Sequence, residues 1–232
     1  MNLTTTFPIP AAPALMNHQS RVLAMGSCFA ASMGSRLSKL PLEVMTQPFG
    51  TLFHPFAITR ALSGEVSEDL YEHGGYFLHP DYHSVFTSNS SADLVEDIRS
   101  VATEVVDFKT SADFLILTWG TSFSYFDKHL NKTVANCHKM PSDRFEKRLS
   151  TVDEIVSHFC SLLSTLPSTT QVVLTVSPVR HTKDGMQENQ VSKSTLRVAT
   201  DIISKQFENV HYFPAYEIML DELRDYRFYE AD

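Results

Sequence analysis

Short apolar runs alternate with longer amphipathic stretches along most of the chain. The runs predict strands at five places: residues 21–25, 42–45, 113–118, 171–176 and 210–213. Apolar residues recur with helical spacing in the segments between them: residues 27–40, 56–62, 92–105, 151–166, 187–206 and 216–223. Because the strands are continuous apolar runs, we expect both of their faces to be buried. The alternation predicts an α/β fold in which about five mainly parallel strands form the middle of three α/β/α layers.

Three segments show neither the apolar runs of the predicted strands nor the helical spacing of apolar residues. Residues 1–20 contain three prolines and are interpreted as an extended lead-in. Residues 63–91 and 119–141 are rich in polar and aromatic side chains, and both are predicted to be loops. Connections of this length are often functional. At 232 residues, the chain is expected to form a single domain over its whole length, 1–232.

Composition excludes several classes of function. Hydrophobic residues make up 43% of the chain, which is enough for a full core. The net charge of −8 repels phosphate backbones, so nucleic acid is not expected to be a main partner. No run of ~18 apolar residues encodes a membrane span, and the N-terminus does not resemble a signal peptide. The three cysteines are an odd, widely spread set, which is typical of a reducing compartment and indicates a cytoplasmic protein.

Polar clusters follow three of the predicted strands at the point where each strand ends. They lie at residues 26–28, 119–122 and 177–181. In parallel sheets covered by helices, ligands bind beyond the carboxyl ends of the strands. The convergence of these clusters at one edge therefore predicts a functional site there.

Cys28 is the most reactive group in the first cluster. It lies where a strand turns into a helix, and a thiol at the positive end of a helix gains thiolate character. The adjacent Ser27 is an alternative nucleophile, or it caps the helix. A free cysteine after a buried strand is also often an inert core residue, so both interpretations stay open.

The cluster after the third strand contains groups that donate hydrogen bonds. The amide of Gly120 and the hydroxyls of Thr121 and Ser122 can stabilise a developing oxyanion. The same residues also fit a glycine turn with local side-chain caps.

Two further clusters are candidates for contact with substrate. Arg180 and His181 form a candidate clamp for an anion, because the planar guanidinium binds two oxygens at once. Asn136, His138 and Lys139 form a candidate substrate-contacting loop. Each cluster also fits an exposed polar loop. No histidine or cysteine pair has the usual zinc spacing, so no metal is predicted.

Taken in order, these segments resemble the GSCFA family, a branch related to the SGNH (GDSL) hydrolases. The shared motifs are MGSCFA at 25–30, PFG at 48–50, LTWGTS at 117–122, NCHK at 136–139, SPVRH at 177–181, KDG at 183–185 and DELRDYRFY at 221–229. Each motif is short, but the ordered set extends from about residue 21 to the end and is specific. The resemblance implies a flavodoxin-like α/β/α fold and ester or acyl chemistry.

The resemblance also implies roles for individual residues. The first SGNH block places its glycine on Gly26 and its nucleophile on Cys28, where the serine enzymes have serine. The second block places an oxyanion-stabilising amide on Gly50. The third block places further donors on Gly120 and Ser122, with Ser122 standing where the superfamily has asparagine.

The last SGNH block is Asp-x-x-His, which supplies the general base and the carboxylate that orients it. The resemblance places that carboxylate on Asp232, and the matching histidine would be three positions further on. On this interpretation the chain is truncated within its last catalytic block, and we expect it to be poorly active. A thiolate depends less on a base than a serine hydroxyl does, because it ionises near neutral pH.

The resulting hypothesis is an acyl-ester hydrolase that forms an acyl-enzyme on Cys28, with a small-molecule or glycan ester as substrate. One alternative is an O-acyltransferase, in which a sugar hydroxyl of a glycan precursor intercepts the same intermediate. Another is a non-catalytic module that binds a glycan or other ligand on the same fold. No metal or organic cofactor is implied, and the sequence leaves the oligomeric state undefined.

Overall fold

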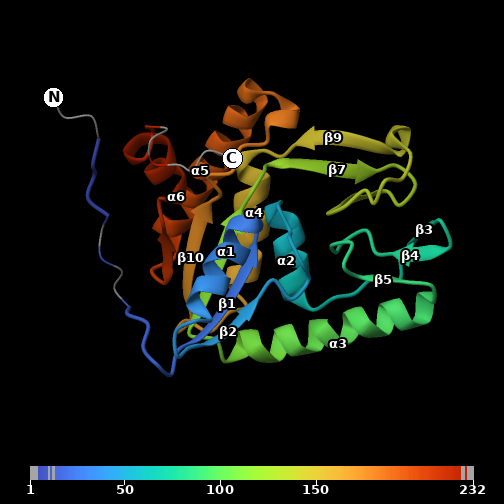
Figure 1. The fold of residues 1–232 in the computed structure, drawn as a ribbon, viewed down its shortest axis with the longest axis horizontal. Helices are drawn as coiled ribbons and strands as arrows, with labels where there is room; N and C mark the ends of the chain where they lie inside the picture. Colours follow the sequence, from blue (N-terminus) through green and yellow to red (C-terminus); the bar gives the residue numbers. More distant parts are fainter. Residues whose placement is uncertain (1–4, 10, 12–13, 226–227, 229–232) are drawn as a thin grey trace.

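A five-stranded parallel sheet forms the centre of the molecule in the computed structural model, which describes residues 5–9, 11, 14–225 and 228 (Figure 1). Its strands are β1 (Arg21–Gly26), β2 (Glu43–Thr46), β6 (Phe114–Trp119), β10 (Gln171–Val176) and β11 (Val210–Tyr212). Their spatial order is β11-β10-β6-β1-β2, and all neighbours pair in parallel. Counted along the chain the order is 2-1-3-4-5, the flavodoxin-like arrangement. The predicted number and direction of strands are confirmed.

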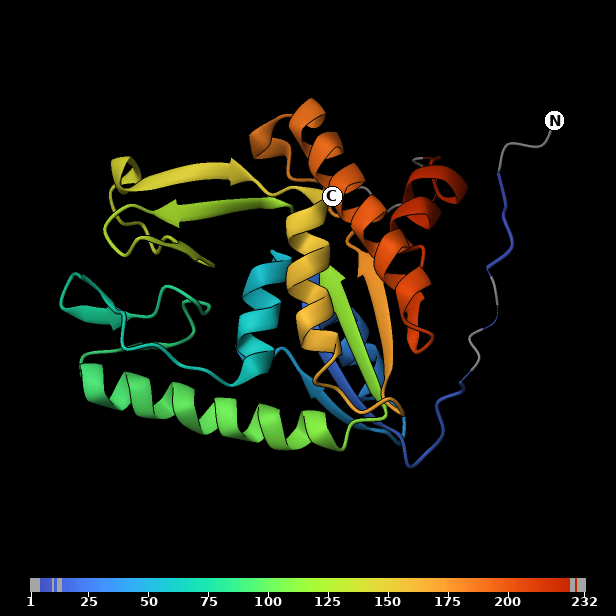
Figure 2. The ribbon, with the colours of Figure 1, turned by 180° about the vertical axis from the view of Figure 1, so that it is seen from behind.

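Helices cover both faces of this sheet, as Figures 1 and 2 show from opposite sides. They are α1 (Cys28–Leu37), α2 (Pro55–Ser63), α3 (Ser91–Thr110), α4 (Val152–Leu163), α5 (Met186–Gln206) and the short α6 (Ala215–Glu217), which runs into a π-helical turn, η3 (Ile218–Glu222). Successive side chains of β1 point to opposite faces of the sheet and so pack in different layers. Leu23 and Met25 join the core formed with α2 to α5, whereas Val22 and Ala24 pack on the opposite face with Leu37 of α1. The three-layer α/β/α fold expected from the sequence is confirmed.

Helix boundaries follow local capping signals. Thr151 and Glu154 form a reciprocal capping box at the start of α4, where the side chain of each accepts a hydrogen bond from the backbone amide of the other. Helix α3 begins after the Ser90 cap and ends at Thr110, five residues beyond the expected boundary. It continues because Phe108, one turn beyond the expected end, packs into the core.

The two segments predicted to be loops contain most of a second region, the β lobe, which we define as residues 65–90 and 121–150. One antiparallel sheet is formed by β3 (Tyr71–His73), β4 (Tyr76–Leu78) and β5 (Thr87–Ser88). Another is formed by β7 (Phe123–Asp127), β8 (Lys132–Val134) and β9 (Phe145–Leu149). The loop prediction was therefore wrong. The strands have two to five residues and mixed polar and apolar faces, too short for a strand period to be visible.

Buried ion pairs attach the β lobe to α2. The Asp81 carboxylate is 3% exposed and pairs with both Arg60 of α2 and Lys132 of β8, with the Lys132 Nζ at 3.0 Å. Lys132 also contacts Asp69 at 2.7 Å, and Arg60 donates to the carbonyl of Thr133 at 3.1 Å. Charged groups thus connect the small sheets to the rest of the protein, together with apolar lobe residues such as Tyr82, which lies in the main core and stacks on Phe49.

Asp127, at the end of β7, holds the two small sheets together. Its carboxylate is fully buried and accepts hydrogen bonds from Tyr71 Oη at 2.8 Å and Arg144 Nε at 2.7 Å, and from the amides of His129 and Leu130. Burial acts to raise the pKa of Asp127, but these hydrogen bonds outweigh it and hold the pKa below its ordinary 3.8.

We expect Asp127 to make the stability of the protein sensitive to acid. Because its folded-state pKa is depressed, its contribution is present above about pH 4 and is lost as the pH falls through the folded-state value. Asp127→Asn should lower the free energy of unfolding by about 3 kcal/mol at pH 7 and flatten its dependence on acid pH. Urea unfolding from pH 3 to 7 measures both effects. The exposed Asp143→Asn is the matched control, and equal pH profiles in the two variants would contradict the assignment.

Candidate functional site

The site expected from the sequence lies where β1 and β6 run side by side. The chain leaves β1 for α1 on one face of the sheet, and it leaves β6 toward the β lobe and α4 on the other side (Figures 1 and 2). At such a point, the connections that follow two neighbouring strands cross to opposite faces of the sheet. In parallel sheets a ligand commonly binds there, beyond the carboxyl ends of the strands. Cys28 follows β1 there, and Gly120 follows β6.

A sharp turn at Gly26 and Ser27 presents Cys28. Gly26 has a φ of 132°, and the Ser27 amide donates to the carbonyl of Thr118 at 3.0 Å. The Ser27 side chain is 1% exposed and accepts a hydrogen bond from the Phe29 amide as the N-cap of α1. The Cys28 side chain is exposed as the first residue of that helix. Of the two interpretations of Ser27, the structure supports the helix cap.

Gln47, which the sequence analysis missed, clamps this turn from the loop after β2. Its Oε1 accepts from the Gly26 amide at 2.9 Å, and its Nε2 donates to the carbonyls of Gly26 and Ser27 at 2.9 and 2.8 Å. Gln47 itself has a φ of 48°, a conformation that is uncommon outside glycine. No motif marks such a residue, because its role depends on a turn that brings it beside β1.

We expect Gln47→Glu to loosen the turn. A carboxylate keeps the acceptor for the Gly26 amide but loses both donors, and it places negative charge against two carbonyls. The free energy of unfolding should fall by about 1–3 kcal/mol, and alkylation of Cys28 by iodoacetamide should slow several-fold. Gln19→Glu is the matched control, because Gln19 is exposed at the other end of β1 and the substitution adds the same negative charge. It should change neither the free energy of unfolding nor the alkylation rate. Matching rates in the two variants would show that the clamp does not position Cys28.

The three residues assigned to the oxyanion hole use their donors inside the protein. The Gly50 amide donates to the carbonyl of Gln47 at 2.8 Å, and the Gly120 amide donates to the carbonyl of Phe53 at 2.8 Å. Ser122 is fully buried, and its hydroxyl contacts Ser192 of α5. In this conformation these groups are not free to donate to a substrate oxygen. The amide of Cys28 differs, because within the described residues it donates no hydrogen bond.

Lys193 of α5 is the second residue that sequence reasoning missed. It is fully buried, and its Nζ donates to the carbonyls of Gly120 at 2.6 Å and Ser177 at 2.8 Å, which follow β6 and β10. Burial lowers the pKa of Lys193 to about 8, and the negative charge of Cys28 acts to raise it. The sequence contains one weak signal: Lys193 lies three residues before Leu196 on the apolar face of α5.

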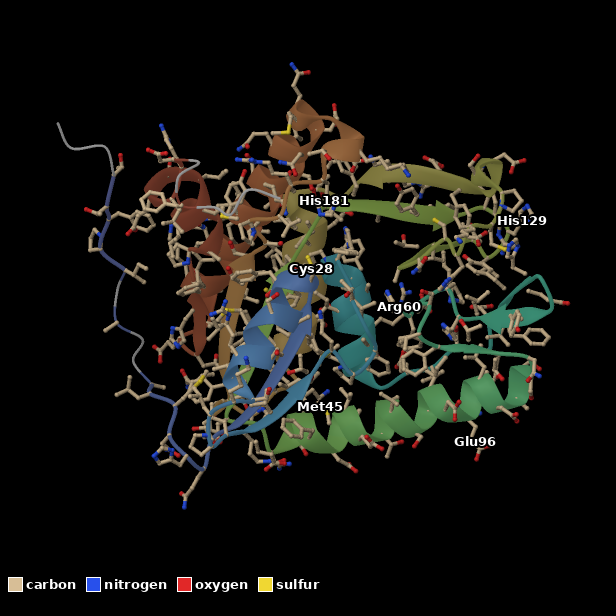
Figure 3. The ribbon with its side chains drawn as sticks, in the orientation of Figure 1. Cys28, Met45, Arg60, Glu96, His129 and His181 are labelled. Carbon is tan, nitrogen blue, oxygen red and sulfur yellow. The ribbon has the colours of Figure 1, made fainter. Side chains whose placement is uncertain are left out.

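Arg180 and His181 lie beside a groove of about 380 Å³. The groove is also lined by Phe53, Thr121, Phe123 and Tyr125, and the rings of Phe53 and His181 meet edge to face at 5.7 Å. Burial and the charge of Lys193 hold the pKa of His181 below its ordinary 6.5. The His181 amide donates to the buried side chain of Asn189, which fixes this loop on α5. In the view of Figure 3, Cys28 and His181 lie near the middle of the molecule.

The loop of Asn136, His138 and Lys139 joins the β lobe rather than this edge. The Asn136 amide donates to the carbonyl of Pro80 at 3.0 Å, and the buried ring of His138 contacts the carbonyl of His79 at 2.8 Å. His138 and Lys139 have φ values of 47° and 60°, as a tight loop requires. The contacts thus attach this loop to the other small sheet. Asp232, the expected orienting carboxylate, lies outside the described residues.

The other two thiols are less suited to nucleophilic chemistry. Burial and the charge of Asp127 raise the pKa of Cys137 to about 11. Burial also raises the pKa of Cys160, which donates to Gln206 from α4. Both are therefore protonated thiols at neutral pH, and both are only partly exposed, whereas Cys28 is exposed.

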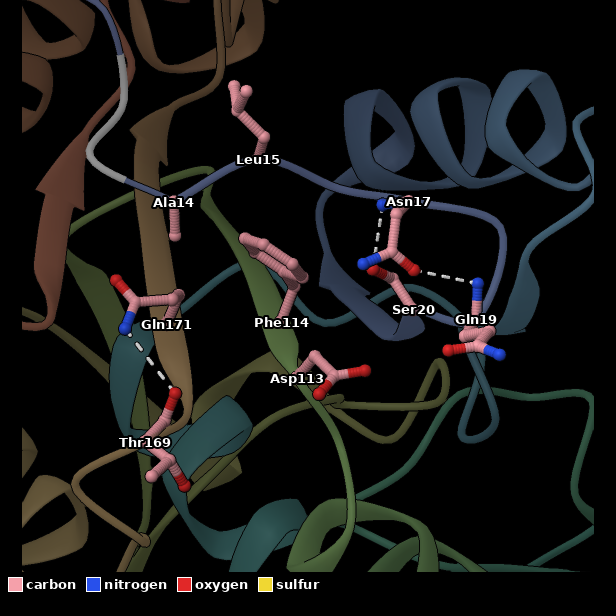
Figure 4. Close-up of a pocket in the computed structure, with 9 residues that line it drawn as sticks. All are labelled: Ala14, Leu15, Asn17, Gln19, Ser20, Asp113, Phe114, Thr169 and Gln171. Carbon is pink, nitrogen blue, oxygen red and sulfur yellow. Dashed lines mark hydrogen bonds between the residues drawn. The ribbon is translucent and has the colours of Figure 1, made fainter.

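A second hollow of about 420 Å³ lies at the opposite, amino edge of the sheet, beneath the lead-in (Figure 4). Its polar groups largely bond to each other or to backbone, as in the contacts of Asn17 with Ser20 and Gln19. Its one carboxylate, Asp113, accepts from the Arg21 amide at 2.8 Å. The described residues that line it include no thiol, histidine or lysine, so the Ser20 and Thr169 hydroxyls have no imidazole or amine base beside them to activate them for acyl transfer.

Two further properties concern the described part of the chain as a whole. None of its helices combines the length and the apolar character that crossing a membrane requires. Its histidines, cysteines and carboxylates also do not gather in any group of three or more that could hold a metal ion.

Fold and site together define a parallel α/β protein with an exposed cysteine just beyond the carboxyl end of its first sheet strand. The model of the GSCFA family matches residues 21–232, and the chain belongs to this family. Among curated proteins and solved structures, no match was found.

Proposed function

We propose that this protein is an acyl-ester hydrolase that forms a thioester on Cys28. The observation that carries the proposal is the position of an exposed thiol as the first residue of α1, beyond the carboxyl end of β1. The positive end of a helix favours a thiolate over a thiol. The motif resemblance to the SGNH hydrolases, which place their nucleophile at this point, supports the same assignment.

The chemistry takes two steps. The Cys28 sulfur attacks the ester carbonyl, a C–S bond forms, the C–O bond breaks, and the alcohol leaves with the proton that the thiol gave up. Water then attacks the thioester, which releases the carboxylic acid and returns the thiol. Each step therefore conserves atoms and charge: thiol and ester give thioester and alcohol, and thioester and water give thiol and acid. Neither step needs an oxidant, a metal or a cofactor.

The oxyanion of each tetrahedral intermediate requires donors at the site. We assign this role to the Cys28 amide and the positive end of α1, since the amides of Gly50 and Gly120 already donate to carbonyls. Ser122 is likewise occupied with Ser192. This differs from the set of donors that the family resemblance implies.

The groove beside the site suits a substrate with both apolar and polar faces. Phe53 and Tyr125 expose 40% and 38% of their surface there, and exposed rings of this kind stack on sugars. Arg180 is exposed and, within the described residues, makes no ion pair, so its guanidinium is available to an anionic or hydroxyl-rich group. We therefore propose a glycan or small-molecule ester as the substrate, with Arg180 and His181 in contact with it.

An O-acyltransferase would use the same thioester, with a sugar hydroxyl in place of water. Cys28 is exposed, so an acceptor other than water can approach its thioester, which is the observation that favours this second candidate. The distinction between the two lies in the acceptor and not in the first step.

The test is to trap the intermediate. The protein is mixed with an activated ester such as p-nitrophenyl acetate, quenched in acid and measured by intact mass, and the modified peptide is then mapped. We expect one acyl group on Cys28, which disappears as free acid accumulates. When a sugar acceptor is added, an acylated sugar would identify a transferase, and free acid alone a hydrolase. No adduct, or an adduct on Cys137 or Cys160, would contradict the proposal and favour a binding module.

A further inference from the structure

Lys193 is an unusual residue for the interior of a protein. A lysine is almost never fully buried without a partner, because removing an ammonium group from water is unfavourable. Here the side chain is 0% exposed, and two of its three N–H groups are directed to the carbonyls of Gly120 and Ser177. The two carbonyl groups accept hydrogen bonds from the ammonium, but they are neutral. They therefore leave the positive charge of Lys193 without a negative partner of their own.

The topology brings Lys193 to the edge where Cys28 lies. Gly26 of β1 is in register with Thr118 of β6, so Cys28 and Gly120 leave adjacent strands two residues later. Cys28 approaches this edge from α1 on one face of the sheet, and the fully buried Lys193 approaches it from α5 on the other. The two side chains interact electrostatically, since the negative charge of Cys28 acts on the ionisation of Lys193.

We propose that the Lys193 ammonium is the counter-ion of the Cys28 thiolate beyond the carboxyl ends of β1 and β6. The inference rests on the proposed function, because it explains how the nucleophile assigned there is activated. Lys193 is a positioning residue in this scheme: it acts through Cys28 and through the carbonyls of Gly120 and Ser177, without touching the substrate.

Linkage makes the interaction reciprocal. If the thiolate charge favours the protonated form of Lys193, the ammonium favours the thiolate by the same free energy. Because burial lowers the pKa of Lys193 only to about 8, the group stays mostly charged at pH 7 and loses its charge above pH 8. Its stabilising effect on the thiolate is therefore present at neutral pH and is lost in alkaline solution.

The other titratable group that faces Lys193 in the described structure is His181, from the loop after β10. Burial and the charge of Lys193 hold its pKa below 6.5, so His181 is neutral throughout a titration between pH 7 and 10. A change in that window therefore reports on Cys28 and Lys193.

The first experiment measures the rate of iodoacetamide alkylation of Cys28 against pH, with the modified peptide quantified by mass spectrometry. In Lys193→Met we expect the half-maximal pH to rise by about 1 unit, and in Lys193→Arg to return most of the way to the wild-type value. Lys109→Met is the matched control. Lys109 is also buried and donates to a carbonyl, that of Leu62, but it precedes β6 and so lies at the opposite end of the sheet.

The second experiment leaves Lys193 in place, so it does not depend on the fold tolerating its loss. The protein is labelled with lysine carrying ¹³C at Cε, and the Lys193 signal is titrated by NMR in the wild type and in Cys28→Ser. Because Cys28 is exposed, this variant should fold normally. Without the thiolate charge, the pKa of Lys193 should fall by about the amount by which the alkylation profile moved.

The outcomes separate this inference from the proposed function. An unshifted alkylation profile in Lys193→Met, or an unshifted Lys193 titration in Cys28→Ser, would overturn the ion pair and leave Lys193 as a structural tie between β6 and β10. Acylation of Cys28 by an ester would still be observed in that case. Conversely, shifted titrations in a protein that forms no thioester would support the ion pair and overturn the hydrolase.

Discussion

Replacing Cys28 by alanine is expected to reduce ester hydrolysis by roughly 10³-fold or more and to abolish the acyl adduct. The reason is that in the proposed mechanism the Sγ atom forms the covalent bond, and the other candidate nucleophiles in the described part of the chain are not placed to substitute for it. Ser27 is buried and caps α1, and Cys137 and Cys160 are held as protonated thiols by burial. The assay uses whichever ester acylates the wild-type protein, with initial rates and intact mass measured together.

The same substitution should lower the free energy of unfolding by no more than about 1.4 kcal/mol, because the side chain is exposed and its loss removes only an ion pair expected to shift a pKa by about 1 unit. Loss of activity without loss of stability separates a chemical role from a structural one. Cys160→Ala is the matched control, and its activity should equal that of the wild type. If Cys28→Ala retained more than about a tenth of the activity, another residue would have to be the nucleophile.

Much of the central sheet could be predicted from the sequence because its strands are buried on both faces. Runs such as residues 114–117 have no polar positions to confuse the pattern, and the helices between them carry caps such as Thr151. The carboxyl edge followed from the same pattern, since polar groups begin where each run stops. Cys28 was therefore found by its place beyond a strand and not by its residue type alone.

The residues that sequence reasoning missed act through tertiary contacts. Lys193 is one lysine in an amphipathic helix, and only the packing of α5 on the sheet shows that it lies on the buried face. Gln47 works through a left-handed backbone and a turn 21 residues earlier in the chain. The strands of the β lobe are too short for a period, and Asp81 and Asp127 fix them through ion pairs that no local pattern reveals.

The assignments that rested on motif position alone were less complete. The resemblance placed oxyanion donors on Gly50 and Gly120 from their order along the chain, but the backbone directs both amides to carbonyls. The motif of Asn136 and His138 likewise uses its polar groups inside the protein, since both residues bind backbone carbonyls of the β lobe. A motif identifies which residues a family uses, whereas the direction of an N–H group depends on the three-dimensional turn that contains it.

Gly26 is the position at which a single methyl group should have the largest effect on stability. A Cβ atom added there would lie 2.1 Å from the carbonyl oxygen of Thr118 and 2.9 Å from its nitrogen, far inside contact distance. The obstacle is backbone of the central strand β6, which is hydrogen-bonded on both sides and cannot move aside. The φ of 132° is itself unfavourable for any residue with a side chain.

We expect Gly26→Ala to lower the free energy of unfolding by about 4 kcal/mol or to prevent folding, because strain and overlap add at one point. Gly74→Ala is the matched control. Gly74 also has a positive φ, of 61°, but nothing lies within 4 Å of an added Cβ, so only the backbone penalty of about 1 kcal/mol should remain. Urea unfolding of both variants measures the difference. If both variants lost the same free energy of unfolding, the turn before Cys28 could widen without disturbing β6. The position of the Cys28 thiol would then not depend on glycine at residue 26.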